Sequence, residues 1–239
     1  MIYFNKIYNT DCMKGMQFLI ESNIKFDLII TSPPYNLGGD FHTMGKNGRI
    51  TYGDYSKYKD KKNEEQYQLW QIDCLNLMYE LLKEDGSLWY NHKNRISKGR
   101  TISPLEWLSK TDFILKQDIT WNQKKGANVD KCRCFPFSEK IYWLTKSPKV
   151  KIHNKNNFTD VWDIVPKTNR KKMGHPAVME LEVVERIYSF YEDKEDLLVF
   201  DPFAGTATTF LPIKDKYQWI GFESDEKYVE IAINRLRPH

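Results

Sequence analysis

The stretch from Asp27 to Asn36 constrains this chain more than any other. The continuous apolar run from Phe26 to Thr31 is typical of a strand that is buried on both faces of a parallel sheet. This run leads directly into Ser32, Pro33, Pro34 and Tyr35. Because the prolines fix their φ angles and lack N–H groups, the segment predicts a stiff turn where a central strand ends.

The residues of this turn suit the binding of a planar base that carries an exocyclic amine. The Ser32 hydroxyl and the proline carbonyls can accept hydrogen bonds from an NH₂ group, which raises the electron density on its nitrogen. Tyr35 offers an aromatic face on which a base can stack. A proline turn that only ends a strand is the alternative, since such turns are common. The strand before the turn and the Tyr-Asn after it favour the binding interpretation.

A second pattern, near the end of the chain, is typical of a nucleotide-binding site. The predicted strand from Asp196 to Phe200 leads into the turn Asp201 to Thr206, which contains Gly205. A glycine turn lets the backbone approach a ligand closely. Glu223 ends the next predicted strand, where an acid can accept hydrogen bonds from ribose hydroxyls.

Together the two patterns resemble those of the beta-class amino-group DNA methyltransferases, and the resemblance covers essentially the whole chain. Ser32 to Tyr35 resembles the catalytic motif, in which Asp, Asn or Ser precedes Pro-Pro-Tyr; serine is similar to the cytosine-N4 version. Asp201 to Thr209 resembles the S-adenosylmethionine motif Asp-Pro-Phe-x-Gly-x-Gly-Thr-Thr. Ala207 replaces its second glycine, and this departure puts cofactor affinity in doubt. The order, with the catalytic motif first, is the permuted order of that class.

The resemblance implies an α/β fold: a Rossmann-like S-adenosylmethionine-dependent methyltransferase with a circularly permuted, mostly parallel sheet and a target-recognition insertion. It implies S-adenosyl-L-methionine as the cofactor and catalytic roles for Ser32, Pro33, Pro34 and Tyr35. The implied cofactor-binding residues are Asp11 at the adenine, Glu223 at the ribose, His175 near the methionine end, and Asp201, Phe203, Ala204, Gly205 and Thr206 around the methionine and ribose. For Asp11 a simple turn residue is the alternative, and for His175 an ordinary helix N-terminus with proline in its first turn.

A basic segment lies between the two motifs. From Trp121 to His175 there are 13 Lys and Arg residues against 4 Asp and Glu, a local balance of +9 in a chain of net charge +4. Such a local excess of positive charge is typical of a segment that contacts phosphate groups, although a solvated lysine-rich loop is the alternative. The predicted DNA contacts are Lys124, Lys125, Lys131, Arg133, Arg170, Lys171 and Lys172. We therefore expect residues 1–120 and 174–239 to form the catalytic and cofactor-binding domain, and residues 121–173 the target-recognition region.

The rest of the composition predicts an ordinary globular protein of the cytoplasm. No stretch approaches the length of a membrane span, and the N-terminus lacks a signal-peptide pattern. The four cysteines show no zinc-ligand spacing, so no metal is expected. The expected partners are double-stranded DNA and a cognate restriction endonuclease. The pattern leaves open whether the chain is a monomer or a dimer.

Periodicity predicts the remaining elements. Strands are expected at Ile2–Asn9, Ser87–Asn91, Gln117–Asn122, Lys140–Lys146 and Trp219–Phe222, and helices at Met13–Ser22, Glu64–Lys83, Pro104–Lys110, Leu181–Phe190 and Ala207–Lys214. Asp225 is expected to cap a final helix. The glycine-rich stretch Leu37–Lys62 is expected to be a mobile loop.

The predicted reaction is methyl transfer to the N4 amine of a cytosine that is flipped out of duplex DNA. Methylation of adenine N6 by the same turn is the nearest alternative, since serine does not exclude it. An RNA or protein amine methyltransferase is less favoured, because those enzymes generally carry the catalytic motif after the cofactor motif. A DNA-binding subunit that has lost activity is supported only by Ala207.

Overall fold

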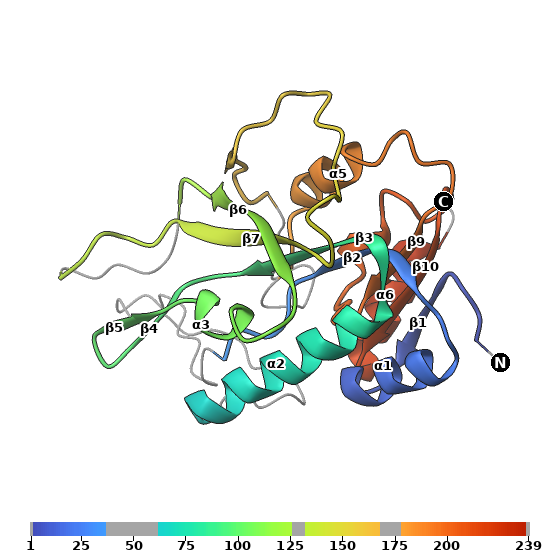
Figure 1. Cartoon of the computed structure of the whole chain (residues 1–239), viewed down its shortest axis with the longest axis horizontal. Helices are drawn as coiled ribbons and strands as arrows, with labels where there is room; N and C mark the ends of the chain where they lie inside the picture. The colour runs from blue at the N-terminus through green and yellow to red at the C-terminus, as the bar shows by residue number, and fades with distance from the viewer. Residues whose placement is uncertain (1, 37–61, 126–131, 168–177, 238–239) are drawn as a thin grey trace.

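A computed structural model describes residues 2–36, 62–125, 132–167 and 178–237. Most of its strands form one eight-stranded sheet, in the order β1-β10-β9-β2-β3-β7-β6-β8 (Figure 1). The strands are β1 (Lys6–Asn9), β2 (Phe26–Thr31), β3 (Leu82–His92), β6 (Ile114–Asn122), β7 (Ser138–Thr145), β8 (Val161–Asp163), β9 (Leu198–Asp201) and β10 (Gln218–Glu223). A separate hairpin pairs β4 (Arg95–Ser97) with β5 (Arg100–Ile102). The helices are α1 (Cys12–Glu21), α2 (Glu64–Leu81), α3 (Leu105–Leu108), α5 (Leu181–Ser189) and α6 (Glu226–Leu236).

Five neighbouring strands, β1, β10, β9, β2 and β3, are parallel to one another, and three of them (β2, β9 and β10) carry the two sequence motifs. β2 lies between β9 and β3, so that Ile29 is paired with Phe200 on one side and with Leu88 on the other. β7 then runs antiparallel to β3, and β6 antiparallel to β7. The predicted mostly parallel sheet is confirmed, and it places two turns from distant parts of the sequence side by side.

Helices cover both faces of this sheet (Figure 1). α1 and α2 pack on one face, and α5 and α6 on the other. Along β2, Leu28 and Ile30 belong to the core on the α5 side, whereas Phe26 and Ile29 belong to the core on the α1 side. Because both faces are covered, these four side chains of β2 are buried in apolar contacts. This double cover accounts for the continuous apolar run in the sequence.

Several predicted boundaries differ from the structure. The helix predicted at Ala207–Lys214 is wrong, since only a 3-10 turn (η1, Thr208–Phe210) forms there. Ala207 has a left-handed φ of 63°, and Pro212 has no N–H to continue a helical ladder. α2 ends at Leu81, two residues before the predicted end at Lys83, because β3 begins at Leu82.

Other predicted elements are shorter than expected or lie outside the described residues. The first strand begins at Lys6, not at Ile2, and α3 is confined to Leu105–Leu108. The predicted cap of the last helix is confirmed, because the Asp225 side chain accepts a hydrogen bond from the Lys227 amide. Of the predicted mobile loop Leu37–Lys62, residues 37–61 lie outside the described residues.

The basic range 121–173 is not separate from the main sheet. β7 lies entirely within this range and pairs with β3, and β8 extends the same sheet beyond β6. Residues of the range can therefore reach the carboxyl end of β3 directly. The assignment of the range to target recognition stays a prediction.

Candidate active site

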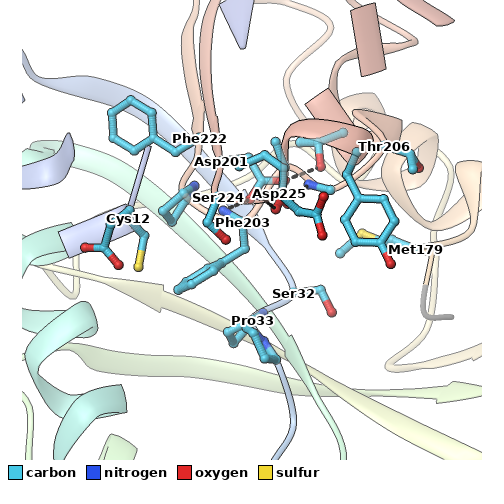
Figure 2. Close-up of a pocket in the computed structure, with 18 of the residues that line it drawn as sticks. Cys12, Ser32, Pro33, Met179, Asp201, Phe203, Thr206, Phe222, Ser224 and Asp225 are labelled. Carbon is cyan, nitrogen blue, oxygen red and sulfur yellow. Dashed lines mark hydrogen bonds between the residues drawn. The ribbon is translucent and has the colours of Figure 1, made fainter. Parts of the chain in front are cut away.

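A cavity lies at the carboxyl ends of the parallel strands, where β1, β2, β9 and β10 each run into a turn. Its empty volume, part of which is open to solvent, is about 1200 Å³. Figure 2 shows Ser32 and Pro33 on one side of it and Asp201, Thr206 and Asp225 across from them. Its lining includes Asp11, Ser32, Pro33, Pro34, Tyr35, Asp201, Phe203, Ala204, Gly205, Thr206 and Glu223. The cavity thus brings together all predicted catalytic residues and all predicted cofactor-binding residues except His175, which lies outside the described residues.

The Ser32 hydroxyl belongs to a small cluster of side-chain oxygens. Ser32 Oγ lies 2.9 Å from the Tyr35 hydroxyl and 3.2 Å from Asn91 Oδ1. The Tyr35 hydroxyl is also 2.9 Å from Asn91 Oδ1 and 3.0 Å from Glu139 Oε2. Asn91 lies near the end of β3 and Glu139 lies on β7. Sequence reasoning missed both residues, because neither belongs to a local motif.

The Tyr35 ring differs from its predicted role as a stacking platform. The side chain is only 8% exposed. Its ring lies 4.4 Å, between centroids, from the ring of His92, and its hydroxyl points into the oxygen cluster. The tyrosine is held by the protein through both its ring and its hydroxyl, so most of its surface is not available to a base in this structure.

The second proline of the turn is held from behind by α2. The Pro34 carbonyl accepts hydrogen bonds from the Tyr67 hydroxyl at 2.7 Å and from Gln71 Nε2 at 3.4 Å. The Tyr67 hydroxyl also lies 2.7 Å from His92 Nε2, and burial lowers the pKa of this histidine to about 3. Within the described part of the chain, no hydrogen bond ends at the Pro33 carbonyl. The turn therefore keeps one carbonyl as an acceptor while the other anchors it.

Asp201 links the two motifs. Its Oδ1 accepts hydrogen bonds from the Thr31 hydroxyl at 2.7 Å and the Phe203 amide at 3.0 Å, and its Oδ2 accepts one from the Thr209 hydroxyl at 2.6 Å. The residue is 2% exposed, and this burial raises the pKa of its carboxyl group to about 6. Its oxygens are engaged within the protein, so the carboxylate organises the turn.

Glu223 occupies the end of β10 beside the glycine turn. Its Oε2 accepts a hydrogen bond from the Gly205 amide at 3.0 Å, and its Oε1 accepts one from the Asp225 amide at 2.8 Å. Burial raises the pKa of the Glu223 carboxyl group. A carboxylate has about four acceptor positions, so these two bonds fix its orientation and leave room for ligand hydroxyls.

Asp11 lines the cavity at the start of α1, and Arg235 contacts the glycine turn from α6. Asp11 is the N-cap of α1, and its Oδ1 accepts hydrogen bonds from the Met13 and Lys14 amides. Arg235, on α6, donates to the Thr206 hydroxyl at 2.8 Å and to the Thr208 hydroxyl at 3.0 Å. Asp11 therefore has a structural role, as the turn alternative implied, and it also lines the cavity.

Several lining residues were not identified from the sequence. They are Trp70, Val178, Met179, Asp225 and Tyr228. The sequence predicts Asp225 only as a helix cap. Trp70 packs edge-on against Phe203, with 5.7 Å between ring centroids. No local pattern separates such residues from ordinary core, because only the fold brings them to the cavity.

The predicted DNA contacts that the structure describes do not line the cavity. Lys124, Lys125 and Arg133 are exposed and are not among its lining residues. Lys131, Arg170, Lys171 and Lys172 lie outside the described residues. Lysines 124, 140, 146, 155 and 167 of the basic range each pair with a carboxylate. These ion pairs offset part of the positive charge that the sequence shows.

The fold and the chain order of the two turns define a class of protein. Residues 26–234 match the model of the N6/N4 methyltransferase family, which is described as DNA methylase. The chain belongs to this family of amino-group DNA methyltransferases, whose members use S-adenosylmethionine. The predicted family, fold and cofactor are confirmed.

The similarity to known methyltransferases covers most of the chain. It is 26% identical over 246 residues to the Type II methyltransferase M2.MboI of Moraxella bovis, with 96% of this chain and 86% of that protein covered. It is 27% identical over 248 residues to the Type II methyltransferase M.ScaI of Streptomyces caespitosus, with 88% and 75% covered.

Two solved structures show the same fold. The PvuII DNA methyltransferase, described as cytosine-N4-specific, superposes with a TM-score of 0.74 at 21% identity and covers 98% of this chain and 86% of its own. The complex of M1.HpyAVI with S-adenosylmethionine has a TM-score of 0.68 at 21% identity and covers 98% and 99%. No helix in the described ranges is long and apolar enough to cross a membrane.

The residues of the cavity fit S-adenosylmethionine. Trp70 and Phe203 offer aromatic surface for a purine, and Glu223 offers an acceptor for ribose hydroxyls. The carboxylates of Asp11, Glu223 and Asp225 give the lining a negative balance that suits a cationic ligand. The volume is large enough for a ligand of this size.

Proposed function

We propose that this protein transfers a methyl group from S-adenosyl-L-methionine to the N4 amine of cytosine in duplex DNA. Family membership establishes amino-group methylation of DNA, and the choice of cytosine is the proposal. The observation that carries it is the position of Ser32: this residue directly follows β2, and its hydroxyl, in place of a carboxylate, lies in the same cavity as the glycine turn.

In the proposed arrangement Glu223 binds the ribose hydroxyls and Asp11 lies toward the adenine. The segment from Phe203 to Thr206 encloses the methionine and ribose side, and Asp201 holds that segment in place through Thr31 and Thr209. His175 would flank the methionine end. When bound, the cofactor supplies a methyl group that its sulfonium already activates.

The protein's part in the reaction is to activate and position the amine. The lone pair of an exocyclic amine is delocalised into the ring, so the nitrogen is a poor nucleophile. When Ser32 Oγ and the Pro33 carbonyl each accept an N–H hydrogen bond, a pyramidal nitrogen with a localised pair is favoured. Pro34, which Tyr67 anchors, keeps the turn rigid, and this positioning lowers the entropic cost of an in-line displacement.

The choice between cytosine and adenine rests on the first residue of the turn. Serine in this position is similar to the cytosine-N4 version of the motif, and the PvuII enzyme, with the same fold, is described as cytosine-N4-specific. Methylation of adenine N6 is the second candidate, because the same two acceptors can bind either amine.

The DNA must reach the cavity as a flipped base, because an amine inside the stacked duplex is inaccessible. Lys124, Lys125 and Arg133 are exposed near the β6–β7 connection and are proposed to contact phosphates, together with Lys131, Arg170, Lys171 and Lys172. Since the similar curated proteins are Type II methyltransferases, we propose a role in restriction-modification beside a cognate endonuclease.

The variant Ser32→Ala tests the proposal. It should abolish transfer of labelled methyl groups to duplex DNA, while the cofactor Kd and the circular dichroism spectrum stay unchanged. Ser97→Ala, the same change at an exposed serine of the β4–β5 hairpin, serves as a matched control and should retain activity. Full activity of Ser32→Ala would remove Ser32 from the reaction.

A further inference from the structure

The cluster of side-chain oxygens beside Ser32 ends in the carboxylate of Glu139, to which the proposed function assigns no role. Glu139 Oε2 lies 3.0 Å from the Tyr35 hydroxyl, which lies 2.9 Å from Ser32 Oγ. Glu139 is not among the residues that line the cavity, and it contacts the turn from β7. The three side chains form a continuous chain of hydrogen-bonding groups that leads from the cavity to the second half of the sheet.

The hydrogens in this cluster can be assigned from the chemistry of its members. A carboxylate only accepts hydrogen bonds, and the Asn91 amide presents its oxygen to the hydroxyls because its nitrogen donates to the Lys140 carbonyl at 3.0 Å. Tyr35 has one hydroxyl hydrogen, and the charge-assisted bond to Glu139 is its strongest option. The Ser32 hydrogen then points to Tyr35 or Asn91, both of which belong to the protein.

This assignment decides what Ser32 offers to a substrate. With its hydrogen directed into the cluster, the serine presents lone pairs to the cavity and acts as an acceptor. If the acceptors behind it were absent, the hydroxyl could rotate and donate instead, which does not activate an amine. The acceptor character of Ser32 therefore depends on the groups behind it.

We propose that Glu139 is a positioning residue for methyl transfer, which orients the two hydroxyls and takes up the proton released by the methylated amine. This inference rests on the proposed function of the Ser32 turn. It also identifies an acceptor for the proton that the methylated amine releases. The Ser32–Tyr35 turn itself contains no carboxylate that could take up this proton.

The proton transfer is balanced. When the nitrogen has gained its methyl group, one N–H bond breaks, its electron pair stays on nitrogen, and the proton bonds to Ser32 Oγ. The Ser32 proton passes to the Tyr35 oxygen, and the Tyr35 proton passes to Glu139. The products are a neutral methylated amine and a protonated carboxyl group. Glu139 is partly exposed, so it can return this proton to solvent.

Several charged or titratable groups of the described residues lie around the relay. His92, which packs on the Tyr35 ring, is buried and has a pKa lowered to about 3. Lys140, next to Glu139 on β7, pairs with Asp118, and Lys124 on the neighbouring connection pairs with Asp163. Lys93 Nζ lies 6.0 Å from the centre of the Tyr35 ring. Among the described residues, Glu139 is the only carboxylate in hydrogen-bond contact with Tyr35.

The test compares single-turnover methylation of duplex DNA by the wild type and Glu139→Gln over a range of pH. The glutamine keeps the shape and can still accept from Tyr35, but it cannot take up a proton. At neutral pH its rate should fall by about tenfold to a hundredfold, with the cofactor and DNA Kd values unchanged. The pH profile of the Glu139→Gln rate should differ from that of the wild type, because the glutamine cannot exchange a proton with Tyr35.

Two further variants separate the relay from a structural role. Glu139→Asp should recover part of the rate, and adding Tyr35→Phe to Glu139→Gln should cost little more than either change alone, because groups that act as a unit are not additive. Asp118→Asn, which removes an exposed carboxylate from neighbouring β6, is the control and should leave the rate unchanged.

The outcomes distinguish this inference from the proposed function. An active wild type, together with a Glu139→Gln variant that keeps the full rate and the same pH profile, overturns the relay alone. A wild type that binds the cofactor but methylates neither cytosine nor adenine overturns the proposed function and the relay with it.

Discussion

The hydroxyl of Thr31 donates a 2.7 Å hydrogen bond to the carboxylate of Asp201. Thr31 is the last residue of β2, immediately before the serine turn, and Asp201 is the last residue of β9, immediately before the glycine turn. Both side chains are buried. This one contact therefore joins the predicted amine-binding turn to the predicted cofactor-binding turn across 170 positions of sequence.

Thr31→Val is expected to destabilise the protein and to weaken both turns together. The change keeps the side-chain shape but removes one of the donors to a buried carboxylate, at a cost of about 2 kcal/mol in the free energy of unfolding. Thermal unfolding should show a lower Tm, and cofactor affinity should fall as well. Thr31→Ser, which keeps the donor, is the matched control. An unchanged Tm for Thr31→Val would mean that the contact does not support the site.

Arg235→Ala is expected to weaken cofactor binding without unfolding the domain. The Arg235 guanidinium is the group on α6 that holds the Thr206 and Thr208 hydroxyls, so its loss frees the glycine turn. Calorimetric titration with S-adenosylmethionine should show a Kd raised about tenfold, which corresponds to about 1.4 kcal/mol. Lys227→Ala, an exposed change on the same helix, should leave the Kd as it is. Equal Kd values for the two variants would argue against this role of Arg235.

Glu223→Ala is expected to act mainly on cofactor affinity. The variant removes the acceptor proposed for the ribose hydroxyls and also the bond to the Gly205 amide. Since bonds to charged groups contribute about 1.5–3 kcal/mol, the Kd should rise by about tenfold to a hundredfold. Glu226→Ala provides a comparison at an exposed carboxylate close by in the chain. A Kd that does not change would contradict the assignment of Glu223.

His92 is expected to make the fold sensitive to acid. Its pKa is 6.5 in the unfolded chain and about 3 when buried, so between these values the unfolded state binds more protons. The native state therefore loses stability as the pH falls through this window, by up to about 1.4 kcal/mol per pH unit. Asp201, with its raised pKa of about 6, contributes the opposite slope.

Comparison with His92→Gln isolates this contribution, because Asp201 is present in both proteins. Urea unfolding between pH 7 and pH 4 should show that the stability of the wild type relative to the variant declines as the pH falls. A constant difference between the two would show that His92 does not titrate in this way.

Local pattern was sufficient to predict the parts of the fold that are continuous in sequence. The apolar run of β2 and the acid at the end of β10 each carry their signal in a few adjacent residues, and the parallel sheet places their ends together. Asp11, Ser32, Gly205 and Glu223 all lie at the predicted carboxyl edge for this reason. The family was predicted from short motifs of the same kind, which lie next to these strands.

The features that escaped prediction depend on contacts between distant segments. Asn91 and Glu139 reach Tyr35 only because β7 pairs with β3 in one particular register, in which Asn91 lies opposite Ile141. The missing helix after Ala207 depends on a left-handed backbone angle that composition does not reveal. Similarly, the covering of the Tyr35 ring by His92 follows from tertiary packing and not from the motif.

The most direct test of the account is to identify the methylated base. Duplex DNA incubated with the protein and isotopically labelled S-adenosylmethionine is digested, and its nucleosides are separated and identified by mass spectrometry. The account predicts label in N4-methylcytosine. Label in N6-methyladenine would keep the mechanism and contradict the choice of cytosine. Absence of label from both bases, with cofactor binding measured in the same preparation, would contradict the proposed reaction.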